Sequence, residues 1–167
     1  IQPMEVDTEG ATQLLVSSID YNDYVGRIGI GRIERGTVTQ GQSVTVANYN
    51  NIHLKSNGKL VNLYQIEGLQ RVACESAKAG DIVCFSGLEK INIGDTVCAT
   101  DCVEPHKFVK ITEPTVEMTF SVNDSPFAGK DGKWVTTRHI RDRLFRELLR
   151  DVSLRVEETG SADSYRV

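Results

Sequence analysis

The stretch of this sequence closest to a nucleotide-binding motif is GKDGK, at residues 129–133. A P-loop reads G-x-x-x-x-G-K-[ST], because its backbone amides cradle phosphates, its lysine reaches them and its hydroxyl holds magnesium. Here Trp134 stands where the serine or threonine belongs, and no glycine lies five residues before Gly132. No Asn-Lys-x-Asp motif for reading guanine is present either. The sequence therefore predicts no GTP binding or hydrolysis by this chain.

The cysteines and histidines lack the spacing of a metal site. Cys98 and Cys102 are separated by three residues where zinc knuckles have two, and no histidine stands at a matching offset. The three histidines are isolated from one another, and no serine lies in a nucleophile elbow. We predict no catalytic, cofactor-binding or metal-binding residue, with a metal or redox pair at the two cysteines as the alternative.

Binding is the chemistry that the basic residues offer. The net charge of −4 does not fit a free-standing nucleic-acid binder, but residues 130–150 carry seven basic and three acidic side chains. Arginines beside flat glycine backbone suit contact with RNA phosphates. For each residue alone, solvation of an exposed face is the alternative. The candidate RNA-contacting residues are Arg27, Arg32, Arg35, Lys130, Lys133, His139, Arg143, Arg146 and Arg150.

The first three arginines lie in a stretch, residues 19–46, that must position them. Its apolar residues alternate with polar ones or glycine, which is the period of a strand with one buried face. Glycines within the run indicate bends or close backbone approach, so we expect short, strongly bent antiparallel strands in a small closed barrel. The residues expected to be buried are Leu15, Ile28, Ile30, Val38, Val44, Val83 and Val97.

The surrounding sequence extends this barrel to residue 101. We predict strands at 13–19, 59–66 and 82–85, a turn-forming insertion rich in Asn and Gly at 48–58, and a loop before Ile82. Leu60 does not fit the alternation of its strand. Two similar pieces, AGDIVC and IGDTVC, lie 14 residues apart, and this short period favours paired barrel strands in which Gly-Asp makes the turn.

A second unit is expected after a boundary at 101–112. A strand at 115–122 precedes a loop at 123–133, and Thr136 and Thr137 form an N-cap pair for a helix over 137–151. Strands at 153–157 and from 165 complete the first half of a split βαβ fold. The apolar face of the helix holds Ile140, Leu144, Phe145, Leu148, Leu149 and Val152, and Arg141 projects into it and must extend outward to reach solvent. His139, Arg143, Arg146 and Arg150 share another face, which we expect to be exposed to solvent.

Several motifs carry a resemblance to a known family. The run GRIERGTVTQG at 31–41 resembles the signature R-[VI]-x-x-G-x-[VI]-x-x-G of the second domain of translational GTPases. The preceding DYNDYVGRIG at 20–29, SPFAGKDGK at 125–133 and VEET at 156–159 look like the BipA/TypA branch, which is ribosome-associated. The resemblance implies a fold that is mainly β and then α+β. It consists of a translation-factor β-barrel over 1–112 and a partial, ferredoxin-like third domain over 113–167.

The same resemblance implies a function. The chain, which has no initiator methionine and ends in a strand-like run, is expected to be an excised, non-catalytic, ribosome-docking region that relays the state of a missing GTP-binding domain. GTP and magnesium would belong to that missing domain, and ribosomal RNA and proteins would be the partners. No apolar run reaches the 18 residues of a transmembrane helix, so no membrane partner and a cytoplasmic location are expected. The alternatives are the same region of an elongation-factor-G-like or ribosomal-protection GTPase, and a stand-alone barrel that binds a small ligand or metal.

Overall fold

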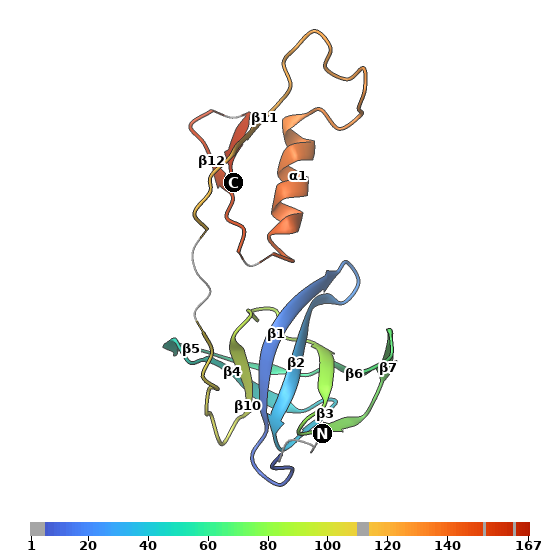
Figure 1. Cartoon of the computed structure of the whole chain (residues 1–167), viewed down its shortest axis with the longest axis vertical. Coiled ribbons are helices and arrows are strands. Elements are labelled where there is room, and N and C mark those ends of the chain that lie inside the picture. Colours follow the sequence, from blue (N-terminus) through green and yellow to red (C-terminus); the bar gives the residue numbers. More distant parts are fainter. Residues whose placement is uncertain (1–5, 110–113, 152, 162) are drawn as a thin grey trace, which may run out of the picture. The chain divides into compact units, whose positions relative to one another are not determined.

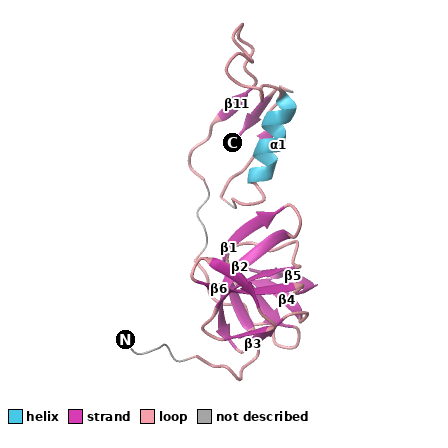
Figure 2. Ribbon diagram, turned by 90° about the vertical axis from the view of Figure 1, so that its right-hand side faces the viewer, coloured by secondary structure: helices cyan, strands magenta, loops and turns pink. Residues whose placement is uncertain are grey.

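The computed structural model describes residues 6–109, 114–151, 153–161 and 163–167, and these form two compact units that divide between residues 110 and 111. Each unit is described by itself (Figures 1 and 2). The first unit is all β: β1 (Gln13–Asn22), β2 (Gly26–Arg35), β3 (Thr37–Thr39), β4 (Ser43–Asn48), β5 (Asn51–Lys59), β6 (Asn62–Glu67), β7 (Gln70–Ala73), β8 (Ser76–Lys78), β9 (Ile82–Ser86) and β10 (Asp95–Ala99).

The strands of the first unit close into a barrel. Eight of them have the order β5-β4-β10-β1-β2-β9-β6-β7, with antiparallel neighbours throughout, and β3 forms a separate antiparallel pair with β8. β5 pairs with β4 and β6 pairs with β9, although β5 and β6 are consecutive and separated only by Leu60 and Val61. The chain therefore bends at these two residues and connects β5, at one end of the sheet, to β6, which lies next to the last strand at the other end. This bent junction supports the predicted closed barrel.

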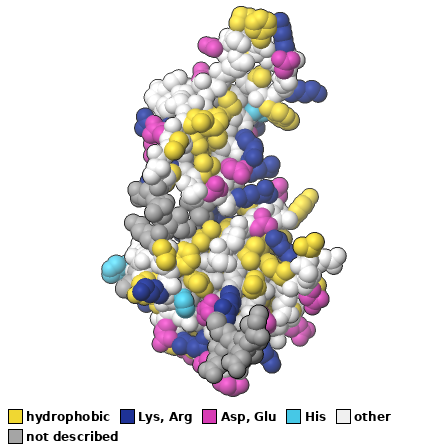
Figure 3. Space-filling view, viewed as in Figure 1, with side chains coloured by type: hydrophobic (Ala, Val, Ile, Leu, Met, Phe, Trp, Pro, Cys, Tyr) yellow, Lys and Arg dark blue, Asp and Glu magenta, His cyan; other side chains and the backbone are white. Residues whose placement is uncertain are grey.

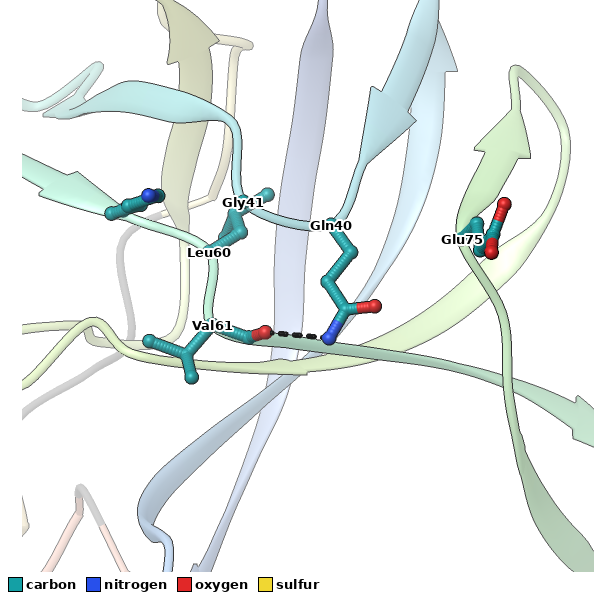
Figure 4. Close-up of a pocket in the computed structure, with 6 residues that line it drawn as sticks. Gln40, Gly41, Leu60, Val61 and Glu75 are labelled. Atoms are coloured by element: carbon teal, nitrogen blue, oxygen red, sulfur yellow. Dashed lines mark hydrogen bonds between the residues drawn. The ribbon is translucent and has the colours of Figure 1, made fainter.

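Hydrogen bonds fix the junction on both sides. The Leu60 amide donates to the Gln42 carbonyl (3.0 Å), and the Leu60 carbonyl accepts from the Gly41 amide (2.7 Å). The Val61 amide donates to the Ser86 carbonyl (2.9 Å), and the Gln40 side-chain amide donates to the Val61 carbonyl (2.9 Å; Figure 4). The side chain of Leu60 is fully buried, which explains why it broke the alternation of its strand.

Three turns with the same hydrogen bonding lead into β4, β9 and β10. In the turns 39–42, 78–81 and 92–95, the amide of the last residue donates to the carbonyl of the first, and the last side chain accepts from the first amide. Gly80 and Gly94 adopt positive φ just before Asp81 and Asp95, as such turns require. The predicted Gly-Asp turns are confirmed. The predicted pairing of the two following strands is wrong, because β9 pairs with β2 and β6, and β10 pairs with β1 and β4.

The buried face of β2 differs from the prediction by one residue. Gly29 and Gly31 are buried with Ile33, whereas Ile30 is only half-buried. A Cβ on Gly29 would lie 2.4 Å from the ring of Phe85, and one on Gly31 would lie 2.2 Å from the Leu15 carbonyl oxygen. Glycine is thus required where neighbouring groups already fill the interior.

Of the other residues predicted to be buried, one is only half-buried and the rest are buried. On β1, Leu14 and Val16 are fully buried while Leu15 is half-buried, and the strand has a bulge between Val16 and Ser18. The remaining predictions are confirmed, since the following are all buried: Ile28, Val38, Val44, Val83 and Val97.

Two segments predicted as irregular are strands. The expected insertion at 48–58 contains only a short turn at Tyr49 and Asn50, closed by the Asn50 amide on the Asn48 side chain (2.9 Å), and then β5. β8 likewise occupies part of the expected loop before Ile82, and β7 precedes it in a segment for which no strand was predicted. Both β5 and β7 are mostly exposed and polar, so the pairing of their backbones is invisible in the hydrophobic pattern.

The second unit comprises β11 (Thr119–Ser121), α1 (Thr137–Glu147), β12 (Glu157–Glu158) and β13 (Ser164–Arg166). The strand order is β11-β13-β12, and β13 is antiparallel to both neighbours. β11 and β12 are therefore parallel, joined through α1 with β13 between them, which is the arrangement of a split βαβ unit.

The elements of this unit are shorter than predicted. The strand expected at 115–122 forms only over β11, and that at 153–157 reaches only β12. Thr136 is the N-cap of α1, and the helix ends at Glu147 instead of residue 151, with Leu148 as C-cap. No residue of α1 is buried, and among the described residues of this unit Tyr165 is the one buried side chain. Weak tertiary packing accounts for the short elements. Val152 and the end of the predicted boundary lie outside the described residues.

Candidate nucleic-acid interface

The arginines of β2 do not gather on one surface. Arg27 lies on the face of the strand that carries Ile33, while Arg32 lies on the opposite face. Arg35 leaves the face of Ile33, because a bulge lets Arg35 and Ile33 pair with the adjacent residues Gln13 and Leu14 of β1. Eight residues of strand separate Arg27 from Arg35, which is a span of at most about 27 Å. The sequence prediction grouped the three because it counted their proximity along the chain.

Two of these arginines bind the barrel itself. Arg27 donates from Nη1 to the Ile91 carbonyl (2.9 Å). Arg35 donates from Nε to the Ala11 carbonyl (3.0 Å) and from Nη2 to Glu104 Oε2 (2.6 Å). The hydrogen bond that Arg35 donates to Glu104 raises the pKa of Arg35 above its ordinary value. Each side chain keeps further N–H groups, but its orientation is set by the barrel.

A hollow of about 860 Å³ lies beside α1, and it is lined by three of the four basic side chains that were predicted to share one face. His139, Arg143 and Arg146 line it, whereas Arg150 does not. The other lining residues are Trp134, Asp142, Phe145 and Leu149. Figure 3 shows dark-blue and yellow side chains interleaved on the second unit. This hollow is thus both cationic and aromatic.

Short-range contacts hold several of these groups. The Thr136 hydroxyl accepts the amide of His139 (3.4 Å) and lies 2.9 Å from its Nδ1. The rings of His139 and Trp134 are edge to face, with centroids 4.9 Å apart and planes at 87°. Arg143 is paired with Glu147 one turn along the helix. The N-cap residue therefore orients the histidine, and the histidine orients the tryptophan.

The other basic residues of this unit lie apart from the hollow. Lys130 places its ammonium 4.7 Å above the ring of Phe127, and Lys133 is exposed. Arg141 lies over the ring of Phe145 at 4.9 Å and pairs with Glu158 at 3.2 Å, which confirms that it reaches out of the apolar arc. Neither lysine lines the hollow.

The aromatic component of the site was missed by sequence reasoning. The sequence pattern places Phe145 on the apolar face of the helix. It gives Trp134 no role beyond occupying the position where a P-loop has serine or threonine. A signal was available, because Trp134 is the one tryptophan of the chain and stands two residues before the N-cap, where it must lie beside the first turn of the helix.

The cysteines give no support to a metal site. All four are free, and Cys98 is buried with its thiol directed at the Glu104 carbonyl (3.4 Å). Burial raises the pKa of the Cys98 thiol, which favours the neutral form over the thiolate that metals bind. Over the part of the chain that the structure describes, no three His, Cys, Asp or Glu side chains group as a metal site would require.

Comparison with known proteins shows which proteins this chain resembles. The Elongation factor Tu domain 2 family matches residues 26–98. The large ribosomal subunit assembly factor BipA of Bacillus subtilis is 49% identical over 166 residues, which is 99% of this chain and 27% of that protein. BipA of Escherichia coli K12 is 49% identical over 163 residues, or 98% and 26% of the two chains. This chain is therefore similar to one region of BipA throughout its length.

The match covers the chain from end to end but spans about a quarter of the length of these BipA relatives. BipA of Haemophilus influenzae gives the same picture, with 45% identity over 100% of this chain and 27% of its own length. The BipA resemblance expected from the sequence motifs is thus confirmed.

A solved structure supports the fold alone. Translation elongation factor SelB from Methanococcus maripaludis in its apo form matches with a TM-score of 0.50 and 18% identity, over 60% of this chain and 21% of SelB. The barrel is therefore a translation-factor fold. In the described parts of the chain, no helix has the length and apolar character needed to cross a membrane.

Proposed function

We propose that this chain is a non-catalytic, ribosome-docking region of a BipA-like translational GTPase. The observation that supports it most is the similarity to BipA along the whole chain, since those relatives are named large ribosomal subunit assembly factors. In this proposal the barrel is domain II, and the split βαβ unit is part of domain III. GTP and magnesium would be bound by a separate GTP-binding domain of the same cytoplasmic protein.

The barrel suits a relaying role. Its sheet is closed and its turns are held by side-chain caps, so it can transmit a displacement as a rigid body. The basic hollow beside α1 is the stronger candidate for contact with ribosomal RNA, because its guanidinium groups face one surface while Arg27 and Arg35 bind barrel carbonyls.

Co-sedimentation of the chain with ribosomal subunits over a salt series tests the proposal. Each phosphate that a cation neutralises steepens the log–log salt dependence, by about 0.7 for single strands to 0.9 for duplex DNA. The triple variant Arg143→Ala, Arg146→Ala, Arg150→Ala should bind more weakly and flatten the slope by about 2.

A matched control removes the same charge from elsewhere in the unit: Arg138→Ala, Arg155→Ala, Arg166→Ala. It should keep the wild-type slope. Absence of the wild-type chain from the ribosomal pellet at low salt would refute docking, and superimposable curves for the two triple variants would refute the role of the α1 face.

A further inference from the structure

The hollow beside α1 contains a preorganised aromatic surface. Trp134 is 77% exposed, yet its indole is held by the edge-to-face contact with His139, whose ring is held in turn by Thr136. An exposed tryptophan on a loop would ordinarily lose side-chain freedom when it binds a ligand. Here the contact with His139 restricts the indole before any ligand arrives, so a planar ligand meets a surface already oriented.

The charges around this indole favour an anionic ligand. Arg143 and Arg146 line the same hollow, and the segment 130–150 has a net charge of +4. Asp142 is the opposing group, and Arg138 lies 3.8 Å from its carboxylate. Arg143 uses part of its guanidinium on Glu147, and a guanidinium has five N–H donors.

The apolar side of the hollow favours a ligand that is also planar. Phe145 and Leu149 supply it, and a hollow of about 860 Å³ is within the size range of small-ligand sites. Aromatic side chains next to guanidinium groups are the means by which proteins bind unpaired nucleotides, with the base stacked and the phosphate paired. A duplex presents its bases already stacked and does not match this arrangement.

We infer that the hollow binds an unpaired RNA nucleotide, with its base stacked on Trp134 and its adjoining phosphates on Arg143 and Arg146. This inference deepens the proposed function and rests on it, because it names the type of RNA that the α1 face would contact. A ribosome provides such nucleotides in loops and bulges of its RNA. Trp134 and Phe145 thereby become binding residues alongside the arginines.

The single tryptophan makes the inference directly measurable. Single-stranded hexaadenylate should quench the fluorescence of Trp134 in the 167-residue chain, whereas an abasic hexamer with the same phosphates should not. Binding of end-labelled hexaadenylate, followed by anisotropy, should weaken about tenfold in Trp134→Leu. Binding of the abasic hexamer should be unchanged in that variant. Trp134→Phe should restore part of the affinity.

Phe127→Leu provides the matched control, because Phe127 is an exposed aromatic of the same loop that does not line the hollow. It should bind hexaadenylate as the wild type does, with circular dichroism confirming that both leucine variants are folded. Equal affinity for the base-bearing and abasic hexamers, without quenching, would overturn the inference. Quenching by RNA-free ribosomal proteins and not by hexaadenylate would assign the hollow to a protein and also overturn it.

The outcome separates this inference from the proposed function. A chain that sediments with ribosomal subunits but shows no quenching by hexaadenylate retains its docking role and loses the stacking site. A chain that is quenched but does not sediment has a nucleotide site and no docking role.

Discussion

The barrel unit and the second unit differ in how completely each one buries its own side chains. In the barrel, the consecutive strands β5 and β6 lie near opposite ends of the sheet and connect them, and most of the apolar side chains that point inward are fully buried. In the second unit, α1 has no buried residue and Phe120, Val116 and Met118 are exposed. The difference teaches that a strand–helix–strand–strand sequence can specify a topology without enclosing a core.

The comparison predicts two separate unfolding transitions. The barrel should be the more stable, because burial of apolar side chains is the main favourable term in folding. The tryptophan reports on the second unit, whereas most of the residues in regular secondary structure, which far-UV circular dichroism follows, belong to the barrel. In a urea titration, the fluorescence midpoint should therefore precede the circular-dichroism midpoint. Coincident midpoints would contradict the separation of the two units.

The largest effect is expected from truncating a core side chain of the barrel. Leu60→Ala should lower the free energy of unfolding of the barrel by about 2–5 kcal/mol, because Leu60 is fully buried at the junction that closes the sheet. Leu144→Ala makes the same change on the half-buried face of α1 and should cost the second unit about 1 kcal/mol. Urea titration of both variants measures the contrast, and equal losses would show that α1 is packed as tightly as the barrel.

A smaller contrast is expected between two glycines. Gly31→Ala should destabilise the barrel by about 1–3 kcal/mol, because the new methyl group would meet the Leu15 carbonyl, which belongs to the backbone and cannot move aside. Gly132→Ala adds a methyl group where no atom lies within 4 Å, and should change stability by less than about 0.5 kcal/mol. Thermal unfolding of the two variants tests this, and a neutral Gly31→Ala would mean that β1 and β2 can separate without cost.

These two regions also differ in what their sequences could predict. The closed barrel followed from short strands, glycines and the turn signals Gly-Asp, because each of these acts locally. The sequence did not show which residues of β2 face the barrel interior. That depends on Phe85, which fills the space over Gly29 from a strand 56 residues further along the chain. Strands β5 and β7 were missed because their exposed polar residues pair through the backbone alone.

In the candidate site, too, features set by local spacing could be predicted and features set by long-range contacts could not. The grouping of His139, Arg143 and Arg146 followed from helical periodicity, which depends on spacing within one element. The separation of Arg27 from Arg35 depends on how far a strand extends, and the bonds of Arg27 to Ile91 and of Arg35 to Ala11 depend on long-range contacts. Trp134 was overlooked because its role arises from a ring contact with His139.

The N-cap of α1 permits a more modest test within the second unit. Thr136→Ala removes the hydroxyl that accepts the His139 amide and should lower the stability of this unit by about 1 kcal/mol. It should also alter the emission of Trp134, since His139 loses its ring contact to Thr136. Thr137→Ala is the matched control, because that hydroxyl bonds Asp163 and not the helix end. An unchanged emission spectrum in Thr136→Ala would argue against the chain of contacts from the N-cap to the indole.

The last contrast concerns two carboxyl groups whose pKa values are shifted in opposite directions. Burial raises the pKa of Asp95 above its ordinary 3.8, against the lowering effect of hydrogen bonds from Asn48 and Asn92. In the second unit, the hydroxyl of Ser153 lowers the pKa of Asp151 below the same value, and the Ser153 amide adds to this effect.

The signs of the two stability effects are therefore opposite. Just above pH 3.8 the folded barrel binds more protons at Asp95 than the unfolded chain does, so the free energy of unfolding falls as pH rises through that window. Below pH 3.8 the unfolded chain binds more protons at Asp151, so the second unit loses stability as pH falls. Subtracting the pH profile of Asp95→Asn, or of Asp151→Asn, from that of the wild type isolates each group. Two differences that slope the same way with pH would show that Asp95 does not bear a burial cost.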